Sequence, residues 1–505
     1  MDQKRQEEDS KEESRQDESK MTGTSCLGGI CCLALSTLLG NPKVAVPGST
    51  AYNGSLASYF SNQQAEIHPA CVVSPQTVHD VSAAVVSLTT TAEGRCGFAI
   101  RSGGHTSWAG ASSIAEGVTI DLRSLNDIDV SADRKTVSIG AGASWDAVYA
   151  KLDPLGLCVA GGRAAGVGVG GLVLGGGISY HSPRFGWTTD TVSNFQVVLA
   201  DGSIVNANAK ENADLFVALR GGSNNFGIVT RVDLEAFDSS PIWASNVITL
   251  LSSADDQIAE FVKINSPTDY DKYASLITTF GYSQARNLSA ISNQLEYTKA
   301  VANVTEGPAV YQGILNLPAL VKTTQLTDMT NLSKATEALQ PDGTRSLNLV
   351  TTLVSTVPML KAAFLRWEAT LPAIRNVSGI VWALALEPLP PAIYARHAKE
   401  NSLGLADRKE ALVVTLLTVT WPNAIDDVLI NTTGAALIEA IEQDARKLSA
   451  YDPYVYLNYA GQFQDPIGSY GEASVRRLRK VRDRVDPKGV FTKQVPGGYK
   501  IPPGK

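Results

Sequence analysis

Apolar and polar positions alternate with two different periods over residues 70–235, which indicates short strands mixed with helices. Val78, Val81, Val85 and Leu88 recur at helical spacing and form one face of a helix expected over residues 74–90. An Asp-Gly pair at 201–202 separates two apolar runs and predicts a hairpin, because this pair tolerates positive φ. The pattern predicts an α+β domain. Its other strands are expected over residues 71–73, 98–101, 118–122 and 136–139, and its other helices over residues 145–152 and 212–219.

Beyond residue 236 the apolar runs become longer, and long helical stretches separate them. This order predicts one antiparallel sheet with helices on one face. The strands are expected over residues 243–250, 275–282, 381–386 and 412–420, with helices over residues 358–370 and 434–450. Along the whole chain we expect a charged disordered tail (1–22), an N-terminal helix and lead-in (23–62), the α+β domain (63–236), the sheet-and-helix domain (237–450) and a closing segment (451–505).

The first residues differ in composition from the rest of the chain. Thirteen of the first twenty are charged, so this segment cannot bury enough apolar surface to fold. The apolar stretch at 26–39 is shorter than the roughly 20 residues that a spanning helix needs, and we expect no stable membrane span. It is either a signal-peptide core behind Met21 or a helix of the folded domain. No basic segment follows Met21, and we favour the folded helix.

Charge and cysteine spacing narrow the classes of partner. The net charge is −7 and the body of the chain has no basic block, which argues against nucleic acid and anionic membranes as partners. The six cysteines have no zinc-binding spacing, so we expect no metal site; they are either buried thiols or disulfides. Six N-x-S/T sequons are compatible with secretion. Without a clear signal peptide the compartment stays open, with the secretory pathway slightly favoured over the cytoplasm.

A glycine loop containing a histidine follows the strand expected at 98–101. It reads Arg101-Ser-Gly-Gly-His105. Its two glycines free the backbone from Cβ clashes, so successive N–H groups can turn inward around an anion such as a pyrophosphate. A histidine directly after such a loop lies beside whatever the phosphates carry, although a Gly-Gly-His turn by itself is more often only a turn.

A second glycine-rich segment covers residues 166–190. Gly166, Gly168 and Gly171 satisfy the G-x-G-x-x-G fingerprint of dinucleotide-binding folds. That fold requires a strand before the motif and a helix after it. Glycines interrupt the upstream residues, and three more at 175–177 would end a helix, so we reject a Rossmann fold. The glycine density indicates an extended ligand lying against bare backbone.

Two further segments complete a pattern that we can compare with known families: residues 219–230 read LRGGSNNFGIVT, and residues 454–471 read YVYLNYAGQFQDPIGSYG. Together the four segments resemble the berberine-bridge-enzyme-like branch of the vanillyl-alcohol-oxidase flavoproteins, especially the fungal FAD-linked oxidoreductases of secondary metabolism. The resemblance runs from about residue 33 to the C-terminus, in the order of the family. It implies a PCMH-type FAD-binding domain of two subdomains, a substrate domain whose antiparallel sheet is covered by helices, and a C-terminal segment that completes the flavin site.

The resemblance also implies how the cofactor is held. His105 matches the residue that bonds the flavin 8α-methyl carbon covalently. Many relatives add a second bond through a cysteine just before the V-G-x-G-G run, but this chain has no cysteine there and Cys158 comes too early, so a single attachment is expected. Relatives often carry disulfides from positions like Cys71 and Cys96 to the N-terminal helix. The cofactor-binding residues implied are Arg101, Ser102, Gly103, Gly104, His105, Gly168, Val169, Gly170, Gly171, Gly175, Gly176, Asp190, Gly227 and Val229.

The catalytic candidates are Tyr456, Asn458 and Tyr459 of a Y-x-N-Y motif. If residues 455–459 form a strand, Tyr456 and Asn458 share one face. Substrate oxidation needs a base, and a phenol can act as one where a cation or hydrogen-bond donor stabilises the phenolate. We therefore expect Tyr456 to be the base, against the alternative that these are satisfied aromatic core residues.

The function that follows is that of an FAD-dependent oxidase. A small-molecule substrate, by resemblance a secondary metabolite, transfers hydride to the flavin, and O₂ reoxidises the flavin to give H₂O₂. Val169 matches a position thought to govern oxygen access, where a small aliphatic residue is permissive. The alternatives are an oxidative cyclase, a dehydrogenase, or a flavin- or ligand-binding protein without catalysis. We expect a monomer.

Overall fold

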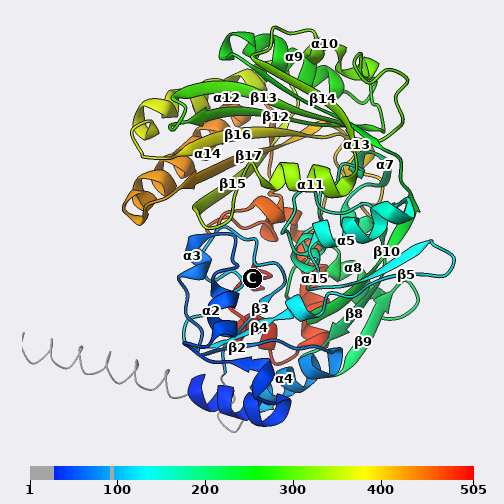
Figure 1. Cartoon of the computed structure of the whole chain (residues 1–505), viewed down its shortest axis with the longest axis vertical. Helices are drawn as coiled ribbons and strands as arrows, with labels where there is room; N and C mark the ends of the chain where they lie inside the picture. The colour runs from blue at the N-terminus through cyan, green and yellow to red at the C-terminus, as the bar shows by residue number, and fades with distance from the viewer. Residues whose placement is uncertain (1–27, 91–95, 505) are drawn as a thin grey trace, which may run out of the picture.

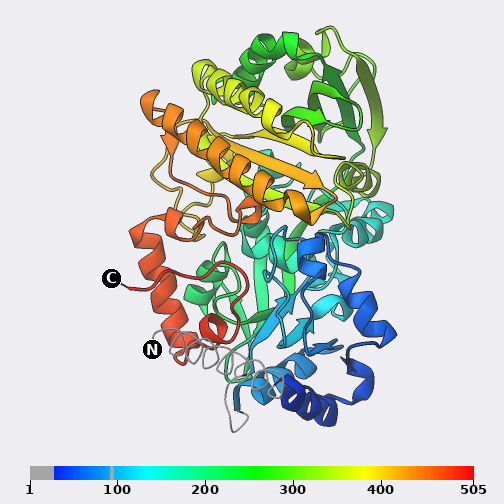
Figure 2. The same cartoon turned by 90° about the vertical axis from the view of Figure 1, so that its left-hand side faces the viewer.

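The computed structural model describes residues 28–90 and 96–504 and divides them into two lobes (Figures 1 and 2). The lower lobe in Figure 1 contains two small sheets, and the upper lobe contains one large sheet with long helices. The expected charged tail over residues 1–22 lies outside the described residues. Within the described ranges, no helix combines the length and apolarity needed to cross a bilayer.

The first small sheet has four strands and begins with the predicted strand–helix–strand unit. Helix α4 (Val78–Thr90) follows β2 and buries Val81, Val85 and Leu88, the face predicted from the sequence. Strands β2, β4 and β3 are parallel to one another, and β1 is antiparallel to β2. The strand order is β1 (Val44–Ala45), β2 (Cys71–Val73), β4 (Val118–Asp121) and β3 (Phe98–Arg101).

Two disulfides attach the N-terminal helix to this sheet. Residues 28–39 are helical, and Leu35 is fully buried. Cys31 bonds to Cys96 just before β3, and Cys32 bonds to Cys71 in β2, which resolves the pairing that the sequence left open. Two short helices follow, α2 (Thr50–Leu56) and α3 (Asn62–Ala65).

The second small sheet has six strands and contains the predicted hairpin. Strands β8 and β9 pair antiparallel across a turn in which Gly202 has a φ of 84°. The order is β5 (Ile128–Val130), β6 (Thr136–Gly140), β10 (Ile228–Asp238), β8 (Val192–Val198) and β9 (Ile204–Asn208), with β7 (Leu157–Val159) pairing the end of β10. The helices of this region are α5 (Trp145–Leu152), α6 (Val169–Leu174), α7 (Ser182–Phe185) and α8 (Ala213–Leu219).

The rejection of a Rossmann fold agrees with this sheet. Strand β7 is antiparallel to β10, whereas a dinucleotide fingerprint follows a strand of a parallel sheet. Helix α6 has only six residues and ends where Gly175 begins the glycine triplet. The glycine-rich segment is therefore a loop with one short helix.

The upper lobe is built on an eight-stranded antiparallel sheet. Helices α9 (Ala254–Ile264), α12 (Val357–Ile374) and α14 (Asp427–Lys447) cover one face, as Figure 2 shows for α12 and α14. Helix α11 (Met329–Glu337) instead contacts α5 of the lower lobe, and the short helices α10 (Gln312–Leu315) and α13 (Pro391–Tyr394) lie at the edges. The strand order is β14 (Val321–Thr327), β11 (Ile242–Thr249), β13 (Leu288–Tyr297), β12 (Ala274–Ser283), β16 (Val381–Leu389), β17 (Leu412–Trp421), β15 (Arg345–Val354) and β18 (Tyr451–Asp452).

The other face of the large sheet points toward the lower lobe and forms a roof over it. Ile277, Ala385 and Leu416 form a small buried cluster on this face, and Tyr459 packs against it. The C-terminal segment then joins the lobes, because β18 pairs β15 while α15 (Glu472–Val485) packs on α8. Helix α16 (Val490–Lys493) follows. The expected α+β architecture, with one antiparallel sheet covered by helices, is the architecture observed.

Candidate active site between the lobes

The two glycine-rich segments cross in direct backbone contact. A Cβ atom on Gly103 would collide with the backbone of Gly168, and one on Gly168 would collide with Gly103. The Ser102 hydroxyl donates to the carbonyl of Ala141 at 2.6 Å and accepts from the amide of Gly170 at 3.2 Å. The structure thus brings together two predicted parts of the site, and only glycine permits this approach.

Arg101 holds the histidine loop in place through its side chain. The buried guanidinium donates to the carbonyls of Ser55 and Ser58, each at 2.6 Å, and lies 3.8 Å from the carboxylate of Asp121. Its Cζ atom lies 3.7 Å from the ring centroid of Tyr59. Because these protein groups occupy the guanidinium, Arg101 contributes to a cofactor site by fixing the loop.

His105 lies at the end of this loop with one face of its ring covered. Its ring stacks on Phe60 with a centroid distance of 4.0 Å. Gly104 precedes it with a φ of 72°, and a Cβ there would meet the Tyr59 ring at 2.7 Å. Burial lowers the pKa of His105 to about 4, so the imidazole is neutral near pH 7 and keeps a free nitrogen lone pair.

The Y-x-N-Y motif reaches the end of α6. Asn458 donates to the Leu172 carbonyl at 3.0 Å and to the Tyr456 hydroxyl at 3.1 Å, and a Cβ on Gly175 would collide with the Asn458 side chain. The prediction of a strand over residues 455–459 is wrong, since η8 (Leu457–Tyr459) is a 3-10 helix. The tight turn still brings Tyr456 and Asn458 together, because it folds the chain back within two residues.

The remaining candidates for cofactor binding lie in several segments of the lower lobe and differ in burial. Val169 is fully buried at the start of α6, and Gly171 is exposed with open space at its Cβ position. The Asp190 carboxylate accepts from the amide of Trp187 and from Asn401, so it closes a buried turn. Gly176 has a φ of 112°, whereas Gly227 and Val229 lie at the start of β10 against β8.

These features fit a long polar ligand with a diphosphate. Glycine at the crossing lets the two loops pack backbone to backbone, and glycine-rich loops of this kind can present N–H groups to an anion. The buried hydroxyls of Thr188 and Thr189 have no hydrogen-bond partner in the described part of the chain. Buried polar groups are normally paired, so unpaired hydroxyls beside Gly176 and Gly177 favour a bound polar ligand. A dinucleotide-type cofactor such as FAD meets both requirements.

Two residues that the sequence analysis missed, Arg163 and Glu387, join the predicted candidate Tyr459 in a cluster under the roof. The Arg163 guanidinium forms an ion pair with the Glu387 carboxylate at 2.8 Å and also donates to the Tyr459 hydroxyl. The Tyr459 hydroxyl in turn donates to Glu387 at 3.0 Å. Arg163 and Glu387 are 9% and 4% exposed. Glu387 is an acid inside the otherwise apolar strand β16, and that exception was a usable signal in the sequence.

Charged neighbours and burial shift the pKa values of this cluster in opposite directions. Although burial disfavours a charged guanidinium, Glu387 and Tyr459 raise the pKa of Arg163 above its usual value. Burial raises the pKa of Tyr459 well above that of a free phenol, while Arg163 opposes the rise. Burial also raises the pKa of Tyr456, where Arg163 and the Asn458 amide oppose the rise. Both tyrosines are therefore neutral phenols at rest, and Tyr459 alone of the two directly contacts a cation and a carboxylate.

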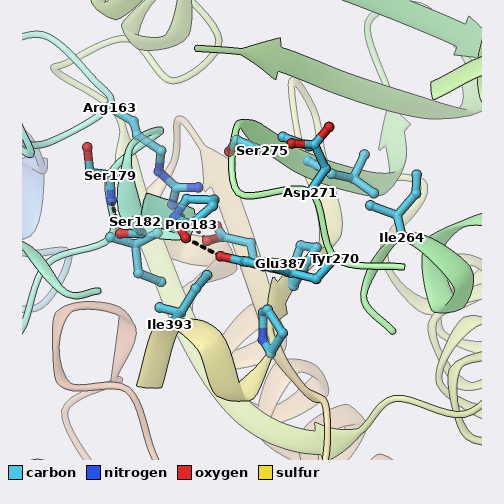
Figure 3. A pocket seen from close by; sticks show the side chains of 15 residues that line it. Arg163, Ser179, Ser182, Pro183, Ile264, Tyr270, Asp271, Ser275, Glu387 and Ile393 are labelled. Atoms are coloured by element: carbon cyan, nitrogen blue, oxygen red, sulfur yellow. Dashed lines mark hydrogen bonds and ion pairs between the residues drawn. The ribbon is translucent and has the colours of Figure 1, made fainter. Parts of the chain in front are cut away.

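A small cavity of about 30 Å³ lies beside the Arg163–Glu387 pair. Figure 3 shows Arg163 and Ser179 on one side of it, with Asp271 and Ile264 on the other. Tyr270 spans it by donating to the carbonyl of Pro183. A polar cavity of this size has room for an ordered water molecule.

Comparisons with known proteins also indicate an FAD-binding chain. A family model described as an FAD binding domain matches residues 69–208. The FAD-dependent monooxygenase sdcF of Emericella nidulans is 37% identical over 479 residues, which cover 94% of this chain and 98% of that protein. The oligopeptidase PhomG' of Diaporthe leptostromiformis is 50% identical over 474 residues, or 93% of this chain. The chain spans 37% of that relative's length.

Solved structures confirm the fold class. Physcomitrella patens BBE-like 1 matches with a TM-score of 0.75 at 19% sequence identity, covering 94% of this chain and 99% of that chain. At that identity the likeness shows the fold alone.

Proposed function

The chain belongs to the berberine-bridge-enzyme-like FAD-linked oxidoreductases, and on this basis we propose that it is an oxidase of a small secondary metabolite. In this proposal His105 holds FAD covalently by a single bond, and O₂ is the final electron acceptor. The observation that carries the proposal is the contact of Tyr459 with both Arg163 and Glu387 beneath the roof.

Bound FAD supplies the redox chemistry, because it accepts a hydride from the substrate and returns two electrons to O₂ as H₂O₂. The glycine crossing supplies N–H groups for the diphosphate at Gly103, Gly104 and Gly168. The neutral imidazole of His105 keeps the lone pair that bond formation to the flavin methyl carbon requires. Cys158 is buried beside β10, where its thiol donates to the Val159 carbonyl, which favours a single attachment.

We assign the proton transfer to Tyr459 in preference to Tyr456. As the substrate C–OH or C–NH group is oxidised, its proton moves to the Tyr459 oxygen, and the original Tyr459 proton moves to Oε1 of Glu387. The nearby Arg163 guanidinium lowers the cost of negative charge on the phenol oxygen during this transfer. Tyr456 has the weaker environment for this role, since the neutral side-chain amide of Asn458 and the backbone of Ile178 are its hydrogen-bonding groups, whereas Tyr459 bonds directly to a cation and a carboxylate.

The test compares two matched phenylalanine substitutions. Substrates are first sought with an oxygen electrode among alcohols, amines and small peptides; peptides are included because a relative is named an oligopeptidase. Anaerobic stopped-flow reduction is then measured. Tyr459→Phe should slow reduction about 10²–10⁴-fold, the usual worth of a positioned acid–base group. Tyr456→Phe removes one neutral hydrogen bond and should cost about tenfold or less. If the two effects are reversed, Tyr456 is the base.

The names of the relatives favour a second candidate, a monooxygenase. The two functions differ in the fate of oxygen. An oxidase forms one H₂O₂ for each product, whereas a monooxygenase places one atom of O₂ in the product. Turnover under ¹⁸O₂ with quantification of peroxide separates them, and label in the product would reject the oxidase proposal.

A further inference from the structure

A second buried acid, Glu296, lies beside the Arg163 cluster and takes no part in the proton transfer described above. It is 3% exposed, and its buried Oε2 atom has no hydrogen-bond partner among the described residues. Its strand neighbour is Ser275 of β12, which lines the small cavity together with Arg163 and Glu387 (Figure 3). The fold therefore places two carboxyl groups near a single buried guanidinium.

A single buried cation can offset the desolvation cost of one buried carboxylate. It cannot offset the cost of two carboxylates equally well. Glu387 already has the ion pair with Arg163 at 2.8 Å and the Tyr459 hydrogen bond. A second ionised carboxylate would be desolvated without a hydrogen bond, which is strongly unfavourable. The stable arrangement has Glu387 charged and Glu296 carrying a proton.

We propose that Glu296 is a positioning residue that stays protonated in the working enzyme, so that Arg163 serves the Tyr459–Glu387 pair alone. Ionisation of Glu296 would draw Arg163 away from the Tyr459 oxygen, which would then lose the cation that stabilises its negative charge during the transfer. Proton transfer to Glu387 would then slow. The positioning role rests on the proposed function, because Glu296 acts through Tyr459. The protonation of Glu296 does not depend on that function.

The surroundings of Glu296 define its titration. The charged and titratable groups that face it are Arg163, Glu387 of β16, Tyr180 before α7 and Tyr311 of η6 (Ala309–Tyr311). Burial raises the pKa of Glu296 to about 8; Glu387 adds to the rise, and Arg163 opposes it. The pKa of Glu296 is higher in the folded protein than in the unfolded chain. The stability that its protonated carboxyl contributes is therefore full at acid pH and is lost as pH rises through about 8.

Thermal unfolding of Glu296→Gln tests the protonation without any substrate. Glutamine has the shape of the protonated acid but does not titrate. The melting temperature of the variant minus that of the wild type should rise by about 4 °C between pH 5 and pH 8. Glu235→Gln, at an exposed position on β10, should show no such trend. A melting-temperature difference between Glu296→Gln and the wild type that does not change with pH would overturn the proposal.

A measurement on the wild type covers the case in which the variant does not fold. Infrared spectra of the purified holoenzyme should lose a protonated-carboxyl band as pH rises from 6 to 10. Absence of any such band would overturn the proposal.

Kinetics test the positioning role. With a substrate in hand, wild-type flavin reduction should fall about tenfold between pH 7 and 9, and Glu296→Gln should abolish that fall while matching the wild type at pH 7. An unchanged pH profile would reject the positioning role. Failure of Tyr459→Phe to slow reduction would instead reject the proposed base and leave the unfolding result intact.

Discussion

Gly103 and Gly168 meet backbone to backbone, although one follows β3 and the other precedes α6. A methyl group on Gly103 must displace the chain at the diphosphate cradle, at a cost of about 1–3 kcal/mol. Gly103→Ala should therefore lower the flavin content of the purified protein about tenfold or more, measured from visible absorbance. Gly171→Ala is the matched control, since its Cβ position is open. Equal flavin content in both variants would contradict the cradle.

The attachment of the cofactor gives a second prediction. Wild-type protein should stay yellow after acid precipitation, because a covalent bond to His105 survives unfolding. His105→Ala should release free FAD or fail to bind it. His79→Ala, at an exposed position in α4, should behave as wild type. Release of all flavin from the wild type would disprove covalent attachment.

Cys158 tests whether there is a single attachment. Its thiol is fully buried, and burial raises its pKa well above the usual thiol value, so it is a poor nucleophile. Cys158→Ser should leave the flavin spectrum and its attachment unchanged. Mass spectrometry of the flavopeptide provides the measurement, and a flavin linked to both His105 and a cysteine would refute the prediction.

The Arg163–Glu387 pair predicts a coupling between two substitutions. Arg163→Met leaves the buried Glu387 carboxylate without its cation and should destabilise the protein by about 3–5 kcal/mol. Adding Glu387→Gln removes that charge, and the double variant should recover part of the loss. Urea unfolding of the wild type, both single variants and the double variant gives the coupling energy. Additive effects would mean that the two side chains do not interact energetically.

The Cys32–Cys71 bond should stabilise the N-terminal helix against the first sheet. Its half-cystines are 39 residues apart, and a loop of that length is expected to contribute about 2–4 kcal/mol. The double variant Cys32→Ala/Cys71→Ala should lower the unfolding free energy by this amount. A reducing agent, which opens the Cys31–Cys96 bond as well, should produce an equal or larger loss in the wild type, and neither change should alter the flavin spectrum. A stability unaffected by both treatments would show that the bond is absent in solution.

The sequence by itself determined several elements and the position of the glycine loop that contains His105. The apolar face of α4 and the Asp-Gly hairpin follow local rules of spacing and turn geometry, and both formed where expected. The glycines around His105 were visible because backbone freedom is a property of single residues. For the same reason the glycine triplet at 175–177 correctly marked the end of α6.

Only the tertiary structure decided the chemistry beneath the roof. Arg163, Glu387 and Tyr459 come from three segments that no local spacing relates, and they meet because the large sheet closes over the lower lobe. The same closure places Glu296 near them, with no hydrogen-bond partner for its Oε2 atom among the described residues. Hydrophobic periodicity records which face of each strand is buried, but it carries no information about which distant polar groups share that burial. Long-range packing therefore shifted the assignment of the base from Tyr456 to Tyr459.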